Sequence, residues 1–187
     1  MKTVMRFLTL AVCLGLAAVA ARAQSTDLGL TLGGNFVSNQ TFSVDKSWVI
    51  EGSLAHRLFG TGGTGLYGEL PIAAAFNNAP KTVGTVLAFH YSSVFVTPGV
   101  KLRIGTPVVS PYFVVGAGFA HFSGPTALGS ETNAAVSYGG GVDVNILPHI
   151  GFRGELRDFN SGLPKFGFSG SGRQHNVFLT GGVFVSF

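Results

Sequence analysis

The sequence contains few charged residues. Asp, Glu, Lys and Arg make up 11% of the 187 residues, whereas they make up about 25% of a typical soluble domain. A water-facing surface needs more charge, so the composition argues against an ordinary soluble protein. Lys2, Arg6 and Arg22 lie in an N-terminal segment that we expect to be removed. The rest has nine basic and eight acidic residues, and a net charge of about +1 excludes nucleic-acid binding.

Cysteine is almost absent. The single cysteine, Cys13, lies in the same N-terminal segment, so the mature chain has no disulfide, thiol nucleophile or cysteine metal site. Val12 is too large for the usual lipid-attachment motif, and lipidation at Cys13 is not expected. No second ligand stands at a recognisable metal-site spacing from any histidine, and we predict no metal or other cofactor. The histidines are His56, His90, His121, His149 and His175.

Residues 1–23 are typical of a secretory signal peptide. Lys2 and Arg6 give a basic start, residues 7–21 form an apolar run, and Ala21-Arg22-Ala23 is a small-x-small cleavage site. The apolar run is too short for a confident membrane-spanning helix. We therefore predict cleavage between Ala23 and Gln24, which leaves residues 24–187 as one mature domain.

After residue 24 no helical period persists, and apolar residues recur at every second position. This predicts an all-β protein of eight strands, at 27–37, 47–58, 64–76, 90–104, 110–122, 134–147, 150–159 and 177–187. Long connections at 38–46, 77–89, 123–133 and 160–176 alternate with short ones at 59–63, 105–109 and 148–149. This alternation is typical of an antiparallel, up-and-down transmembrane barrel with its long loops outside the cell.

The charged residues of the strands keep mainly to one face. In the strand at 90–104, for example, Val100 and Leu102 oppose Lys101 and Arg103. A soluble, lipocalin-like barrel would show the same period, but so few charges suit a narrow interior, where opposite signs pair. The strand at 110–122 is apolar on both sides, and its facing stays open. The predicted lumen charge network is Glu51, Arg57, Glu69, Lys101, Arg103, Asp143, Arg153, Glu155 and Arg157.

Aromatic residues recur near the strand ends on the apolar face. Such rings are typical of the interfacial girdles of a membrane barrel. The predicted girdles are Phe36, Trp48, Phe76 and Phe122 at one rim, with Tyr112 and Phe187 at the other.

The last stretch, residues 176–187, alternates strictly and ends on Phe187. Soluble proteins seldom end on an apolar strand, because termini fray and sheet edges invite aggregation. Val183, Val185 and Phe187 resemble the C-terminal assembly signal of bacterial outer-membrane barrels. The alternative is an ordinary buried last strand.

A late hairpin adds to this likeness. It combines Tyr138-Gly-Gly-Gly-Val-Asp143-Val with Gly151-Phe-Arg153-Gly-Glu155-Leu-Arg157-Asp-Phe159. The mature chain resembles the eight-stranded outer-membrane β-barrel family, the OmpA transmembrane domain and its single-domain relatives. The resemblance implies a bacterial outer-membrane location and insertion by machinery that reads the last strand. It also implies contact with outer-membrane lipid and lipopolysaccharide, and we expect a monomer.

The functional expectation is a non-enzymatic, structural or surface-interacting barrel. An eight-stranded barrel is just filled by its own side chains, which excludes a wide pore but leaves a gate or a narrow ion path as an alternative. The last long connection contains two aromatic residues among cations, which would suit an extracellular ligand or a lipopolysaccharide phosphate. These residues are Lys165, Phe166, Phe168, Arg173 and His175. The alternative is a flexible cap over the barrel mouth.

The remaining alternative is an enzyme that deacylates lipid A. His121 and Ser123 share one face near the predicted outer rim, and Glu131 follows in the predicted loop. A nucleophile, a base and an acid that orients the base are the groups that acyl transfer needs. The His-x-Ser pattern is short and common, so we predict no catalytic site.

Overall fold

The computed structural model describes residues 26–38, 47–61, 64–78, 90–106, 108–125, 129–163 and 172–187. All regular structure in this part of the chain is β-strand. The strands are β1 (Thr26–Ser38), β2 (Ser47–Thr61), β3 (Thr64–Asn78), β4 (Tyr91–Val96), β5 (Gly99–Arg103), β6 (Val109–Ser123), β7 (Ser130–Leu147), β8 (Ile150–Gly162) and β9 (Arg173–Ser186). No helix among the described residues is long and apolar enough to cross a membrane.

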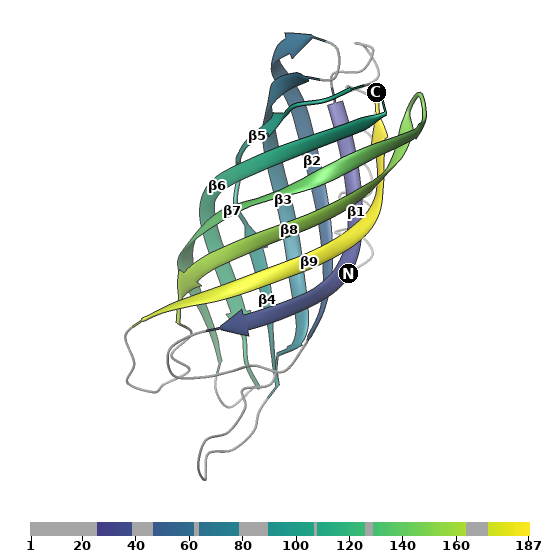
Figure 1. The fold of residues 1–187 in the computed structure, drawn as a ribbon. Coiled ribbons are helices and arrows are strands. Elements are labelled where there is room, and N and C mark those ends of the chain that lie inside the picture. Colours follow the sequence, from purple (N-terminus) through teal and green to yellow (C-terminus); the bar gives the residue numbers. More distant parts are fainter. Residues whose placement is uncertain are drawn as a thin grey trace, which may run out of the picture.

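The strands form one closed antiparallel barrel with a strong tilt (Figure 1). β4 and β5 are two halves of one predicted strand, and each pairs with β3 on one side and β6 on the other. Pro98 lies in the gap between them, and proline has no N–H to donate to a ladder. The barrel is therefore eight-stranded, which confirms the predicted fold class.

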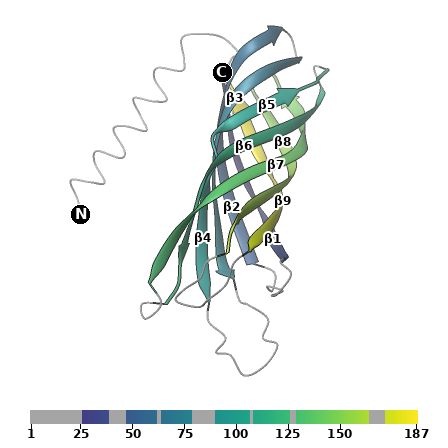
Figure 2. The ribbon, with the colours of Figure 1, turned by 90° about the vertical axis from the view of Figure 1, so that its left-hand side faces the viewer.

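The first and last strands close the barrel. β1 pairs with β9 over its whole length, from Asp27 opposite Ser186 to Ser38 opposite His175. The Phe187 N–H donates to the Thr26 carbonyl at 2.8 Å, and the Thr26 N–H donates back at 3.2 Å. The C-terminus thus lies at the end of the barrel where β2 and β3 are joined (Figure 2). Each strand that the structure describes therefore has a neighbour on both sides, as a lipid environment requires.

The connections sort between the two ends of the barrel. The strand ends joined by 39–46, 79–90, 124–129 and 163–172 form what we call the long-loop end, and those joined by 62–63, 104–108 and 148–149 form the short-turn end. Two strands begin earlier than predicted, β7 at Ser130 and β9 at Arg173. The polar residues at these starts fit a loop by composition, but they pair with β6 and β8.

The two faces of the sheet differ as predicted. The outward face presents exposed apolar side chains such as Leu30, Ile50, Leu102 and Phe152, whereas polar and charged side chains are buried inside. The facing of β6 is now assigned, because Val115 is 53% exposed and Val114 only 5%. An inside-out pattern of this kind suits a lipid surround.

Two girdle predictions were wrong. Tyr112 and Phe122 are buried, at 1% and 0% exposure, because both lie on the inward face of β6. Phe36, Trp48, Phe76 and Phe187 are outward and 37–74% exposed. Apolarity on both faces of β6 had hidden its direction. The interior of this barrel therefore contains aromatic rings as well as charges.

The predicted signal peptide, with cleavage between Ala23 and Gln24, lies outside the described residues. The same holds for Lys165, Phe166 and Phe168 of the last long connection. Val183, Val185 and Phe187 of the predicted assembly signal lie on the outward side of the final strand.

Candidate functional site: the barrel interior

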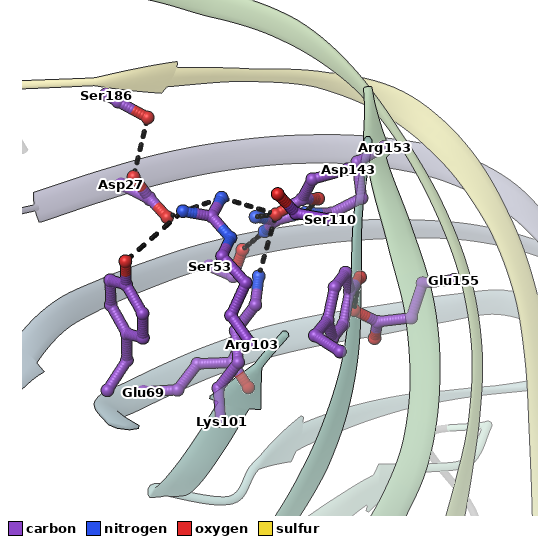
Figure 3. A network of polar contacts seen from close by, with 12 residues as sticks. Asp27, Ser53, Glu69, Lys101, Arg103, Ser110, Asp143, Arg153, Glu155 and Ser186 are labelled. Atoms are coloured by element: carbon purple, nitrogen blue, oxygen red, sulfur yellow. Dashed lines mark hydrogen bonds and ion pairs between the residues drawn. The ribbon is translucent and has the colours of Figure 1, made fainter. Parts of the chain in front are cut away.

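The predicted network residues all project from inward positions of β2, β3, β5, β7 and β8. Eight of the nine are buried, with exposures of 0–7%, and Arg57 is half-buried. They divide into two centres, one around Asp143 and one around Arg157. Figure 3 shows the first centre, with side chains from opposite walls meeting in the middle of the barrel.

Asp143 receives three cations. Arg153 donates from Nε to Oδ1 at 2.7 Å and from Nη2 to Oδ2 at 3.0 Å. Arg103 Nη2 donates to Oδ2 at 2.6 Å, and Lys101 Nζ donates to the same oxygen at 3.3 Å. The paired contact from Arg153 fixes the carboxylate as well as neutralising it, because a guanidinium fork matches carboxylate geometry.

Arg103 also connects this centre to the seam between the first and last strands. Its Nη2 lies 3.0 Å from Asp27 Oδ2. The Ser186 hydroxyl donates to Asp27 Oδ1 at 2.6 Å, so Asp27 joins β1 to β9 (Figure 3). The sequence analysis missed Asp27. Its alternation with Leu28 and Leu30 could have identified it as an inward residue.

The second centre has the opposite imbalance, with three carboxylates around Arg157. Arg157 Nε lies 2.5 Å from Glu155 Oε1, and Nη2 lies 2.8 Å from Glu69 Oε2 and 3.8 Å from Glu51 Oε1. The Tyr112 hydroxyl donates to Glu155 Oε2 at 2.6 Å. The cation-rich centre at Asp143 and this carboxylate-rich centre therefore balance each other within one interior.

Gly141 makes the Tyr112 contact possible. In the sheet it lies between Tyr112 on β6 and Glu155 on β8. A Cβ atom at Gly141 would overlap the Tyr112 hydroxyl and ring. The absence of a side chain lets the phenol cross β7 and reach the carboxylate, which gives a physical role to a glycine of the Gly-Gly-Gly segment.

Aromatic faces cover the cations. Lys101 Nζ lies 3.7 Å from the centre of the Tyr112 ring. The Cζ atoms of Arg103 and Arg57 lie 5.3 and 5.6 Å from the centre of the Tyr67 ring. Both side chains also donate to the Tyr67 hydroxyl, at 3.4 and 3.2 Å. Cations over ring faces gain stabilisation that increases when water is excluded.

An aromatic cluster fills the interior between Arg157 and the long-loop end. Phe159 and Phe178 lie 4.9 Å apart between ring centres, and Phe95 lies 4.9 and 5.5 Å from them. Phe122 and Tyr91 extend the cluster, with ring centres 6.2 Å apart. The sequence analysis did not predict this cluster, because Phe95 and Phe178 alternate with apolar residues and give no contrast between faces. We call these five residues the aromatic cluster.

The residues proposed for an enzyme do not come together. His121 and Ser123 lie on the outward face of β6, and His121 Nδ1 lies 2.8 Å from Thr132 Oγ1. Glu131 belongs to β7 rather than to a loop, and its register position opposite Phe122 is inward. The acid and the other two groups are thus on opposite faces of the wall. The described residues also contain no group of three or more possible metal ligands.

The comparisons with known proteins agree with this geometry. The family model described as the outer membrane protein beta-barrel domain matches residues 9–180. The chain belongs to this family. Membership places the protein in the bacterial outer membrane, as predicted. A comparison with curated proteins found no match.

Solved outer-membrane barrels share the fold. Neisserial surface protein A is 13% identical with a TM-score of 0.66, covering 89% of this chain and 99% of its own. Ail, the attachment invasion locus protein of Yersinia pestis, solved in complex with the heparin analogue sucrose octasulfate, is 14% identical with a TM-score of 0.56, covering 87% and 99%. The outer membrane enzyme PagL is 17% identical with a TM-score of 0.55, covering 86% and 99%. At these identities the likeness shows the fold alone.

A matched pair of substitutions tests the value of burial in this network. Tyr112→Phe removes a donor from buried Glu155 and should lower the free energy of unfolding by about 1–3 kcal/mol. Tyr138→Phe removes an equally short bond, 2.6 Å to Asp158, from the exposed outer face, and we expect a smaller loss. Urea unfolding of both variants in detergent measures the difference. Equal losses would contradict a special role for the interior.

Proposed function

We propose that this protein is a closed, non-enzymatic barrel whose filled interior makes it a rigid support for the connections at its long-loop end. The observation that supports this most is the continuity of the filling. The Asp143 centre, the Arg157 centre and the aromatic cluster follow one another along the axis, and each is built from opposite walls. The interior of an eight-stranded barrel is just wide enough for its own side chains to fill.

The charges in the interior support a structural role over transport. Five buried acids face four buried bases, with half-buried Arg57 as a fifth. Charges that pair so closely with one another stabilise one arrangement, whereas conduction needs groups that release an ion as readily as they bind it. The buried amides beside the aromatic cluster are bonded within the protein: Gln174 donates to the Tyr91 hydroxyl at 3.2 Å and to Asn176 Oδ1 at 2.8 Å, and Asn176 donates to the Phe159 carbonyl at 3.0 Å.

Partners follow from the same proposal. The apolar outer wall contacts outer-membrane lipid and lipopolysaccharide, and the insertion machinery reads Val183, Val185 and Phe187 during assembly. The long connections present a surface for an extracellular ligand, and the barrel acts as a monomer. A rigid barrel suits recognition of a ligand by its long connections. The barrel fixes the ends of these connections in advance, so they need less ordering when a ligand binds.

Conductance measurements test whether the interior is closed. Purified barrel reconstituted in planar lipid bilayers should give no sustained current steps, because the interior is filled. Steps whose ion selectivity changes in Arg157→Gln, inside the barrel, but not in His121→Gln, on the outer wall, would identify a path through the lumen. Such a result would overturn the closed-barrel proposal.

Lipid analysis tests the non-enzymatic part. Cells that express the protein, its Ser123→Ala variant or no barrel should contain lipid A with the same number of acyl chains, as read by mass spectrometry. The physical reason is that Glu131 occupies the inward face and Thr132 is the residue beside His121. Loss of an acyl chain that depends on both Ser123 and His121 would revive the enzyme.

A further inference from the structure

The outer wall of β7, β8 and β9 contains a group of five polar side chains next to exposed apolar ones. These three strands lie side by side (Figure 1). Outward positions on them are occupied by Tyr138, Asp158, Asn160, Arg173 and His175. We call them the outer-wall polar group. Leu156 and Leu179 pair directly on its short-turn side and are 53% and 54% exposed. The change from apolar to polar residues falls close to the long-loop end, where β8 ends and β9 begins.

The position of this group identifies its environment. A charged side chain on the lipid-facing wall costs about 2–4 kcal/mol at the bilayer midplane but only about 0–1 kcal/mol near the interface. An Asp and an Arg on this wall therefore belong at headgroup level. Outer-membrane barrels turn their long loops outward, so the group meets the headgroups of the outer leaflet.

The hydrogen bonds of the group run in one direction. Arg173 Nε donates to Asn160 Oδ1 at 2.6 Å, and Asn160 Nδ2 lies 3.1 Å from His175 Nε2. His175 Nδ1 lies 2.6 Å from Asp158 Oδ2. Because a carboxylate only accepts, Nδ1 holds the proton and Nε2 accepts from Asn160. The same Asp158 oxygen accepts from the Tyr138 hydroxyl at 2.6 Å.

One functional group of this set remains available. Arg173 is exposed, and its contact with the described residues is through Nε, so its two terminal nitrogens point to no partner within them. Asp158 is not available in the same way, because its Oδ1 is buried and its Oδ2 already accepts hydrogen bonds from Tyr138 and His175. The set therefore presents a cationic fork that the contact with Asn160 holds in place.

We propose that the outer-wall polar group binds the phosphorylated sugar headgroup of an outer-leaflet glycolipid. The Arg173 fork would take a phosphate, since guanidinium and phosphate pair through two parallel bonds. The acyl chains of the same molecule would lie along Leu156 and Leu179, which are exposed on the same wall. A lipid matches both features at once, whereas a free phosphate uses only the first.

This inference deepens the proposed contact with lipopolysaccharide, and its test does not depend on closure or catalysis. The barrel is reconstituted in phosphatidylcholine nanodiscs with lipid A, with lipid A lacking its phosphates, or with inorganic phosphate alone. Native mass spectrometry counts the lipid that stays bound. Wild type should retain lipid A several-fold better than the dephosphorylated form, a comparison that needs no variant to fold.

Two variants assign this preference to a residue. Arg173→Gln should lower retention of lipid A about tenfold, the effect expected when a charged hydrogen-bonded partner is lost. Lys81→Gln removes the same charge from the connection between β3 and β4 and should leave retention unchanged. Faster migration of unboiled samples on gels confirms that each variant is folded.

Three outcomes would overturn the proposal. Equal retention of the two lipid A forms by wild type would exclude phosphate recognition. Equal losses in Arg173→Gln and Lys81→Gln would reduce the effect to net charge. Displacement of lipid A by millimolar inorganic phosphate would make the ligand a soluble anion instead of a lipid.

Discussion

The structure depends on one constraint, which is that charges inside an eight-stranded barrel must neutralise one another. The interior of an eight-stranded barrel is about wide enough for side chains alone, and an unpaired buried charge costs several kcal/mol. At about 4 Å and an effective dielectric constant of about 20, one ion pair recovers roughly 4 kcal/mol of Coulomb energy. Asp143 with three cations and Arg157 with three carboxylates meet this constraint jointly. Neither centre is balanced by itself, so the two centres require each other.

The same constraint connects the interior to closure of the wall. Asp27 lies on the first strand and Ser186 on the last, and Arg103 reaches Asp27 from the opposite side of the barrel. The seam between β1 and β9 is therefore held by side chains as well as by its backbone ladder. In lipid the hydrophobic effect does not drive the strands together. Closure therefore depends on hydrogen bonds between strands and on polar contacts across the interior, and both favour the closed barrel over an open sheet.

The outer face follows a different rule, because lipid tolerates apolar side chains and excludes charge. Leu, Ile, Val and Phe cover the wall, and polar residues on it collect towards the rims, as His56 does with Thr26 and His121 does with Thr132. The outer-wall polar group is the most extensive of these among the described residues. Its polar side chains lie towards the long-loop end of the outer wall, whereas those of the interior contact one another.

Much of the fold and of the charge network could be predicted from the sequence. Period-two alternation identified the eight strands, and the charges of β2, β5, β7 and β8 stand out because their neighbours are apolar. Alternation says nothing where both faces are apolar, and for this reason the inward direction of Tyr112 and Phe122 was missed. Composition also made the starts of β7 and β9 look like loops.

Which charges meet could not be predicted. Partners such as Lys101 and Asp143, or Glu69 and Arg157, are far apart in the sequence. Their pairing depends on barrel tilt and on the register between neighbouring strands, and neither leaves a local signal. The role of Gly141 could not be predicted either. Its lack of a side chain matters only because Tyr112 and Glu155 lie on either side of it in the sheet.

A double-mutant cycle between Asp143 and Arg153 tests the central claim most directly. Asp143→Asn, Arg153→Gln and the double variant are compared with wild type by urea unfolding in detergent. We predict a coupling energy above about 1.5 kcal/mol, as close charge pairs shielded from water give. A coupling within the range of about 0.2–1 kcal/mol found for exposed pairs would contradict the view that the interior depends on mutual neutralisation.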